Sequence, residues 1–148
     1  RSIMANQLHC SVCIPTRELF SGLVHYASVP GADGSYGVLP GHEMLVATNR
    51  NGGVLTLNLD EAGNDQRQFL LYEGAAQMFN DVLTVLGRFG VDVNDIDIES
   101  VRSKAEAMRE HIAELEKAEG DQHRAELETS KVRLDWYETQ LDYKEKNS

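Results

Sequence analysis

The chain has 148 residues, of which 41% are hydrophobic, and it carries a formal net charge of −10 at pH 7. This length and apolar content are enough for one domain, or two small ones, with a buried core. The negative charge argues against a protein that binds nucleic acid or an anionic membrane surface, and no run reaches the ~18 apolar residues that a membrane span needs. Because the start of the chain does not resemble a signal peptide, we expect a cytosolic protein.

The composition changes abruptly near residue 91. All three prolines and eleven of the twelve glycines lie before that point. The last 58 residues carry 16 acidic and 9 basic side chains, so most of the negative charge is found there. Glycine and proline punctuate turns between short elements, whereas a charged stretch without them is typical of exposed helices. We therefore predict two domains, residues 1–90 and residues 91–148.

The first domain is predicted to consist of strands. Short apolar or alternating runs are separated by turn residues, and the run at residues 53–59 alternates with a period of two. The predicted strands are residues 7–14, 19–22, 23–29, 44–48, 53–59, 68–72, 76–79 and 82–86. Short strands at this spacing are typical of an antiparallel β-sandwich or a flattened barrel, and we predict the sandwich.

The stretch between residues 30 and 43 is rich in residues that shape loops. Its four glycines and two prolines are Pro30, Gly31, Gly34, Gly37, Pro40 and Gly41. Such a segment cannot continue a helix or a central strand. We predict an exposed connection between strands, which is either a plain chain reversal or a contact surface presented to a partner.

The two cysteines, Cys10 and Cys13, form a single C-x-x-C pair. A zinc site normally needs a second pair of ligands at similar spacing, which the chain lacks. Residues three apart in a strand point to opposite faces, so we expect one thiol to be buried and the other partly exposed. This pattern favours structural cysteines over a metal or redox site.

The second domain is predicted to be a pair of helices. Asp97 is the expected N-cap of the first helix. Apolar residues step by three and four along it, at Ile98, Val101, Ala105, Met108, Ile112 and Leu115. A second seam follows at Leu127, Ser130, Leu134, Tyr137 and Leu141. Because Gly120 breaks the pattern between them, we predict two helices of about 20 residues in an antiparallel hairpin, and hence an α+β fold.

The second seam is the thinner one. Ser130 interrupts it, and Val132 and Trp136 lie off it. A charged helix pair with so little apolar surface is marginal when isolated. We therefore expect the hairpin to be a movable part attached to a rigid β domain.

Two motifs in the first domain carry a family resemblance. The run Leu19–Val24 contains F-S-G, and residues 34–42 read G-S-Y-G-V-L-P-G-H. They resemble the epsilon subunit of F-type ATP synthase, a family with F-S-G near its start and a G-x-x-G-[IV]-x-P-G-H loop shortly after it. The order of the two domains and the total length also match, so the resemblance extends over nearly the whole chain from Met4.

The resemblance implies a non-catalytic subunit without a required cofactor. Members of this family sit at the foot of the central stalk, bound to the gamma subunit, with the β domain touching the ring of membrane c subunits. Their hairpin folds against the β domain or extends along gamma toward the catalytic alpha and beta subunits, and the extended form opposes ATP hydrolysis. The expected location is therefore peripheral, on the cytoplasmic face of the cell membrane, with no nucleic-acid partner.

The family uses its Pro-Gly-His loop to contact the c-ring. The matching residues are Gly37, Pro40, Gly41 and His42. Ser35 stands where some relatives have a carboxylate, so an ionic contribution to ring docking is not expected here. The alternative for His42 is an ordinary hydrogen-bonded loop residue.

Some bacterial relatives bind ATP through an [IL]-D-x-x-R-A motif at the start of the first helix. Here that run begins at Ile98, with Glu99 in place of the aspartate, Arg102 matching, and Ser103 in place of the alanine. Arg109 lies two turns further on the same face, and two aligned guanidinium groups could clamp a triphosphate. The alternative is a solvated helix face, because Glu99 and Glu106 are both in reach of Arg102, and Glu106 is in reach of Arg109. The departures from the motif predict that any ATP binding is weak.

Two other classes of protein, a metalloenzyme and an adaptor, are alternatives to a stalk subunit. A metalloenzyme of the cupin type would need converging ligands, but His9, His25, His42 and Glu43 are not spaced as strand neighbours. A generic adaptor would combine the β-sandwich with a dimeric coiled coil. The break at Gly120 favours a hairpin within one chain over such a coil.

Overall fold

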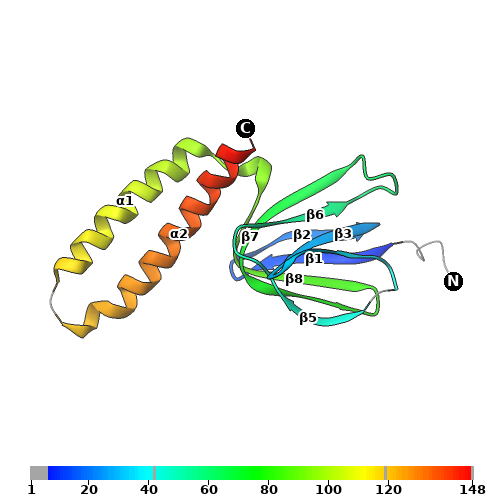
Figure 1. Cartoon of the computed structure of the whole chain (residues 1–148), viewed down its shortest axis with the longest axis horizontal. Coiled ribbons are helices and arrows are strands. Elements are labelled where there is room, and N and C mark those ends of the chain that lie inside the picture. The colour runs from blue at the N-terminus through cyan, green and yellow to red at the C-terminus, as the bar shows by residue number, and fades with distance from the viewer. Residues whose placement is uncertain (1–6, 42, 119, 148) are drawn as a thin grey trace. The chain divides into compact units, whose positions relative to one another are not determined.

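The computed structural model describes residues 7–41, 43–118 and 120–147. The chain divides into two compact units, with the division between Asp95 and Ile96. The first unit consists of strands and the second contains two long helices, which confirms the predicted α+β class (Figure 1). The strands are β1 (Leu8–Ile14), β2 (Arg17–Val24), β3 (Tyr26–Gly31), β4 (Gly34–Val38), β5 (Met44–Thr48), β6 (Gly53–Asn58), β7 (Gln66–Phe79) and β8 (Val82–Asp92).

The strands follow the order β2-β1-β8-β7-β6-β3-β4, and β5 pairs with β7 off this path. Every strand pair is antiparallel except one, because β1 runs parallel to β8, with Cys10 opposite Leu83. The prediction of a purely antiparallel sandwich is corrected in this respect. A parallel pair needs a long crossover, and here the whole of the intervening domain provides it.

The composition of the core indicates that the sheet folds over, so that strands from its two ends face one another. Strands β1 and β3 lie four places apart in the order, yet their inward residues belong to one buried cluster. Two layers of sheet facing one another produce this arrangement, as in a sandwich. The buried residues of the cluster are Leu8, Cys10, Val12, Val24, Ala27, Val29, Val38, Leu55, Leu57, Phe69, Leu71, Ala76, Met78, Leu83 and Val85.

Strand β4 corrects the prediction for the glycine-rich connection. Residues Gly34–Val38 of this connection form an edge strand, which pairs with β3 so that Tyr36 lies opposite Val29. Glycines weaken a central strand, but an edge position has a ladder on one side only and tolerates them. The connection to β5 therefore begins only after Val38, and of its described residues Leu39, Gly41 and Glu43 are exposed.

Strand β7 is longer than predicted, because the runs at residues 68–72 and 76–79 belong to one strand. It passes through Glu73 at φ 47° and Gly74 at φ 147°, a local irregularity opposite Gly87 of β8. A β-carbon at Gly74 would overlap the carbonyl oxygen of Leu86, so only glycine fits there. Strand β8 also extends beyond its prediction, to Asp92, and the short 3-10 turn η2 (Val93–Asp95) follows it.

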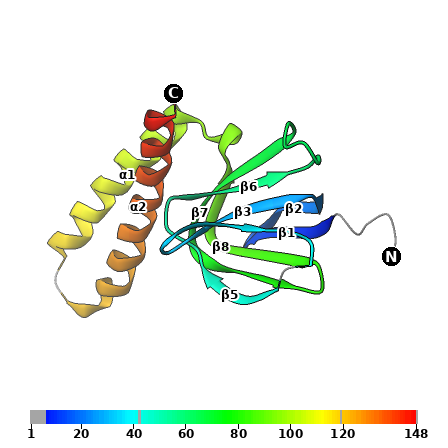
Figure 2. The same cartoon turned by 45° about the vertical axis from the view of Figure 1, so that its right-hand side comes forward.

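The second unit is the predicted helical hairpin, with α1 (Ile98–Lys117) and α2 (Arg124–Lys146) side by side, joined through the short 3-10 turn η3 (Asp121–His123) (Figure 2). Asp97 caps α1 as predicted, because its Oδ1 accepts a 3.2 Å hydrogen bond from the backbone N–H of Ser100. Gly120, which immediately precedes η3, has φ 101°. This backbone conformation favours glycine.

Four of the six residues of the predicted α1 seam are buried, namely Val101, Ala105, Ile112 and Leu115. Met108 is half-buried and Ile98 is 37% exposed. The seam of α2 is less regular than predicted. Its buried residues are Ser130, Trp136 and Gln140, of which only Ser130 lay on the predicted seam. Two of these three are polar, so the apolar surface of α2 is as limited as its sequence suggests.

Candidate contact loop and helical pocket

The candidate contact loop is the connection of residues 39–43. It turns at Pro40–Gly41, where Gly41 has φ +90°, a region that favours glycine. The backbone N–H of Gly41 donates a 2.7 Å hydrogen bond to Oδ1 of Asp81. Leu39 is 48% exposed. The fourth predicted contact residue, His42, lies outside the described residues.

The partner of the loop is the turn between β7 and β8. Asn80 and Asp81 both have positive φ, 50° and 60°, as in the two-residue hairpin turns that match the strand twist. The backbone carbonyl of Asp81 accepts a 2.9 Å hydrogen bond from the N–H of His9. The turn is thereby held to the start of β1 through its main chain and to the contact loop through its side chain.

A small pocket of about 170 Å³ lies beside the loop, lined by Tyr36, Gly37, Val38, Glu43 and Met44. The hydroxyl of Tyr36 is buried and has no hydrogen-bond partner within the described part of the chain. Burial raises the pKa of Tyr36 above its ordinary value. Gly37 has a structural reason to be glycine, because a β-carbon there would overlap the hydroxyl of Tyr26.

An exposed apolar row, which the sequence motifs did not predict, lies on the outer face of the sheet. The register places Leu23, His9, Val82 and Phe79 in line across β2, β1, β8 and β7. Leu23 is 40% exposed, Val82 42% and Phe79 51%. Alternation could have indicated this row, since the neighbours of Val82 and Phe79 along the strands, Leu83 and Met78, are buried.

The row continues along the same sheet face. Leu86, four residues beyond Val82 on β8, is 51% exposed and lies opposite Cys13 and Ala75. The side chains between are polar, at Ser11, Thr84 and Gln77, and the hydroxyl of Ser11 donates a 3.1 Å hydrogen bond to Oε2 of Glu18. Exposed apolar residues gathered on one sheet face are typical of a surface that binds another protein. Met44, at the start of β5, is partly buried and packs against the core.

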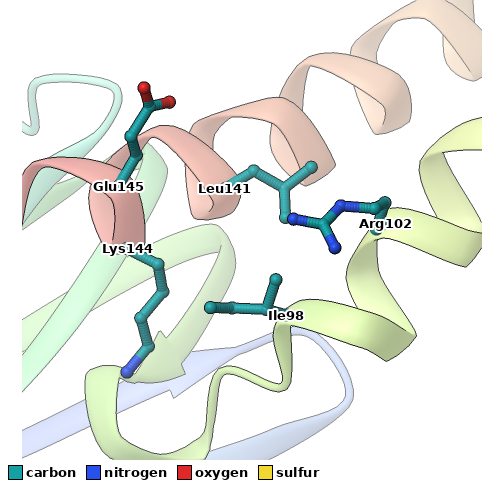
Figure 3. Close-up of a pocket in the computed structure, with 5 residues that line it drawn as sticks. All are labelled: Ile98, Arg102, Leu141, Lys144 and Glu145. Atoms are coloured by element: carbon teal, nitrogen blue, oxygen red, sulfur yellow. The ribbon is translucent and has the colours of Figure 1, made fainter. Parts of the chain in front are cut away.

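The second candidate site is a pocket of about 390 Å³ in the hairpin, lined by Ile98, Arg102, Leu141, Lys144 and Glu145. Figure 3 shows the apolar side chains of Ile98 and Leu141 between the two cationic ones. Arg102 also donates from Nη1 to Oε1 of Glu99 at 3.0 Å. The pair of Glu99 with Arg102 is the one that the solvated-face alternative predicts, and Lys144 of α2 lines the same pocket as Arg102.

Arg109 does not line this pocket. Its Nη2 donates to Oε2 of Glu138 on α2 at 3.2 Å. Two further pairs join the helices, with 3.5 Å between His111 Nε2 and a Glu126 oxygen, and 4.0 Å between Lys131 Nζ and a Glu116 oxygen. The expected partner of Arg109 on its own helix is therefore replaced by a partner across the hairpin.

The cysteines follow the prediction. Cys10 is fully buried in the core and Cys13 is partly exposed, and neither forms a disulfide. Burial raises the pKa of the Cys10 thiol to about 12, so this thiol is unreactive at neutral pH. Within the described residues, no three His, Cys, Asp or Glu side chains are grouped so that they could hold a metal ion.

Comparison with known proteins identifies the family. The family model for the β-sandwich domain of the ATP synthase delta/epsilon chain matches residues 7–91. The chain belongs to the ATP synthase epsilon chain family. The epsilon chain of Hyphomonas neptunium is 34% identical over 84% of this chain and 89% of its own length, and that of Rhodospirillum rubrum is 35% identical over 82% and 92%.

A solved structure shares the fold of this epsilon chain. A chain of the Euglena gracilis mitochondrial ATP synthase, in its OSCP/F1/c-ring assembly, superposes with a TM-score of 0.59 at 21% identity. The match covers 90% of this chain and 79% of the other. The epsilon chain is a non-catalytic subunit, as predicted. In the part of the chain that the structure describes, neither helix is long and apolar enough to cross a membrane.

Proposed function

We propose that this epsilon chain works in the central stalk of the ATP synthase, peripheral to the cytoplasmic face of the membrane. Its β domain joins the gamma subunit to the c-ring, and its hairpin extends toward the catalytic alpha and beta subunits to restrain ATP hydrolysis. The observation that carries this proposal is the division of the chain into a sheet with a large apolar core and a separate hairpin with a thin one.

The hairpin is suited to opening because α2 contributes only a thin apolar surface to the contact between the two helices. Two of the three buried residues of α2 are polar, Ser130 and Gln140. The side-chain pairs between the helices are exposed, and an exposed ion pair such as Arg109–Glu138 or Lys131–Glu116 contributes at most about 1 kcal/mol. An element of low local stability is what a conformational restraint requires.

Removal of the hairpin tests its role. A chain that ends at Asp95 keeps the whole of β8 and η2, and therefore the sheet core. We expect the ATP synthase assembled with this shortened chain to hydrolyse ATP faster than the assembly with the full chain. Equal hydrolysis rates, with both chains incorporated to the same extent, would show that the hairpin is not a restraint.

The loop at residues 39–43 is proposed to contact the c-ring, through Pro40, Gly41 and His42, with Gly37 supporting its base. The exposure of Leu39 and Gly41 supports this role. In reconstituted vesicles, His42→Glu is expected to lower the proton pumping that accompanies each ATP hydrolysed. The control Ala62→Glu places the same charge on another exposed turn and should leave this coupling unchanged.

The apolar row of Leu23, Val82 and Phe79 is proposed as part of the gamma-binding surface. Its support is the exposed apolar area, which is costly to leave in water and lies on a regular sheet face. Phe79→Ser is expected to weaken binding of the isolated epsilon chain to gamma, measured by titration calorimetry. Leu39→Ser, in the loop assigned to the c-ring, serves as the matched control and should bind gamma normally.

We also propose weak nucleotide binding at the helical pocket. Arg102 and Lys144 bring two cationic groups to an apolar surface, beside the carboxylates of Glu145 in the pocket and Glu99 on α1. Calorimetry with millimolar ATP is expected to detect weak binding that Arg102→Ala abolishes. Arg109→Ala should retain it, because Arg109 pairs with Glu138. The absence of any heat of binding for the unmodified chain would end this part of the proposal.

A further inference from the structure

The described residues of the loop between β4 and β5 are mostly exposed. Leu39, Gly41 and Glu43 are exposed, and a β-carbon built on Gly41 would meet nothing within 4 Å. Packing therefore does little to fix the backbone at this turn. Gly41 has φ +90°. Because glycine has no β-carbon, its backbone dihedral angles are less restricted than those of any other residue.

A hydrogen bond takes the place of packing. The Gly41 N–H donates to Oδ1 of Asp81 at 2.7 Å, a short distance for an amide and a carboxylate. These residues are 40 positions apart in the sequence. Hydrogen bonds to charged groups stabilise more than neutral ones do, so this contact can hold a loop that packing leaves open.

The main chain and the side chain of Asp81 hold different segments. Its backbone carbonyl accepts from His9 at the start of β1, and its carboxylate accepts from Gly41 in the loop. Replacing the side chain therefore removes the contact with the loop and leaves the contact with β1 in place. The strand pairing of β7 and β8 also involves only backbone groups.

We propose that Asp81 is a positioning residue for the contact loop, which it holds in the conformation that engages the c-ring. This inference rests on the proposed role of the loop in ring contact. Asp81 does not itself need to touch the ring. Its carboxylate fixes the backbone at Gly41, and this in turn sets the direction in which residues 39–43 are presented.

The backbone conformation of Asp81 allows its side chain to be removed without strain in the turn. At φ 60°, following Asn80 at φ 50°, its position in the hairpin turn is one that glycine occupies readily. Asp81→Gly thus removes the carboxylate without straining the turn, and the melting temperature should stay the same or rise. Asp81→Asn keeps an oxygen acceptor and tolerates positive φ, so it should restore the contact in large part.

The first measurement is hydrogen exchange at the Gly41 amide of the full chain, followed by NMR. In Asp81→Gly we expect this amide to exchange about threefold to tenfold faster, the range that follows from losing one such hydrogen bond at an exposed site. Asp33→Ala, which changes an exposed aspartate in the turn between β3 and β4, is the matched control and should leave the exchange unchanged. Unchanged exchange in Asp81→Gly would overturn the inference.

The second measurement is the coupling of proton pumping to ATP hydrolysis in vesicles that contain the whole ATP synthase. We expect Asp81→Gly to lower coupling although its fold is stable, and Asp81→Asn to retain most of it. If Asp81→Gly leaves coupling intact while His42→Glu lowers it, the loop contact stands and the role of Asp81 is overturned. If neither variant lowers coupling, the proposed contact between loop and ring fails, and the inference fails with it.

Discussion

Arg109 and Glu138 form an ion pair across the hairpin, with 3.2 Å between Nη2 and Oε2. Arg109 was a candidate for binding nucleotide on the evidence of its spacing from Arg102 alone. In the folded hairpin it contacts α2 instead, and it is absent from the pocket that Arg102 lines. This arrangement gives Arg109 a role in holding the closed hairpin.

The first prediction concerns this pair. Arg109→Ala, Glu138→Ala and the double variant should give a coupling energy of about 0.5 kcal/mol at low salt, because both side chains are about half exposed. The measurement is urea unfolding of the full chain followed by helical circular dichroism. In 1 M salt the coupling should nearly disappear, since screening shortens the range of exposed charges. A coupling energy that does not change with salt would contradict an ionic interaction.

A second prediction concerns Arg67 on β7. Its guanidinium lies 2.9 Å from Oδ2 of Asp92 and stacks over the rings of Phe20 and Phe69, 5.6 and 5.2 Å from their centroids. This cluster gives the phenylalanine of the F-S-G motif a structural role. Arg67→Ala should lower the unfolding free energy of the chain by about 1–2 kcal/mol.

Arg67→Lys should recover only part of that loss, because an ammonium group neither stacks nor pairs as a planar guanidinium does. Arg50→Ala, at an exposed position between β5 and β6, is the control and should change the free energy by less than about 0.5 kcal/mol. Full recovery by lysine would indicate that charge alone matters at this site.

The third prediction separates steric overlap from backbone strain at glycines. Gly74→Ala should lower the unfolding free energy by more than about 3 kcal/mol, because its β-carbon would overlap the Leu86 carbonyl on β8. Gly34→Ala is the matched comparison, since Gly34 has φ +125° but open space around it. We expect a loss of about 1–2 kcal/mol there, from strain alone. Equal losses in chemical unfolding experiments would be inconsistent with overlap at Gly74.

The fourth prediction concerns the two thiols. In the folded chain at pH 8, iodoacetamide should label Cys13 and leave Cys10 unmodified, so intact mass should increase by a single adduct. In urea both cysteines should react. Two adducts on the folded chain would mean that the β1 face of the core opens on the timescale of labelling.

The same burial predicts how stability depends on alkaline pH. The pKa of Cys10 rises from 9.0 to about 12 on folding, so between these values the unfolded chain releases a proton that the folded chain keeps. Stability is therefore fully present below pH 9 and should fall as the pH rises toward 12. Cys10→Ala should reduce this fall, as measured by urea unfolding at pH 8 and pH 10. An identical decrease in both proteins would assign the effect to other groups.

Local patterns in the sequence were sufficient for much of the fold. The alternation around Leu55 and Leu57 is the burial pattern of β6, and Asp97 caps α1 where its spacing to the apolar seam predicts. These features depend on neighbours within a few residues, which the sequence contains directly. The F-S-G and Pro-Gly-His motifs likewise indicate the family from the sequence alone.

The tertiary structure decided the contacts that join distant segments. These include the parallel pairing of β1 with β8, the hydrogen bond from Gly41 to Asp81, and the pairing of Arg109 with Glu138. A lone aspartate in a turn, or an arginine with several acidic neighbours, has many partners compatible with its local sequence. Only the closure of the sheet and of the hairpin selects among them, because it fixes which surfaces come within hydrogen-bonding distance.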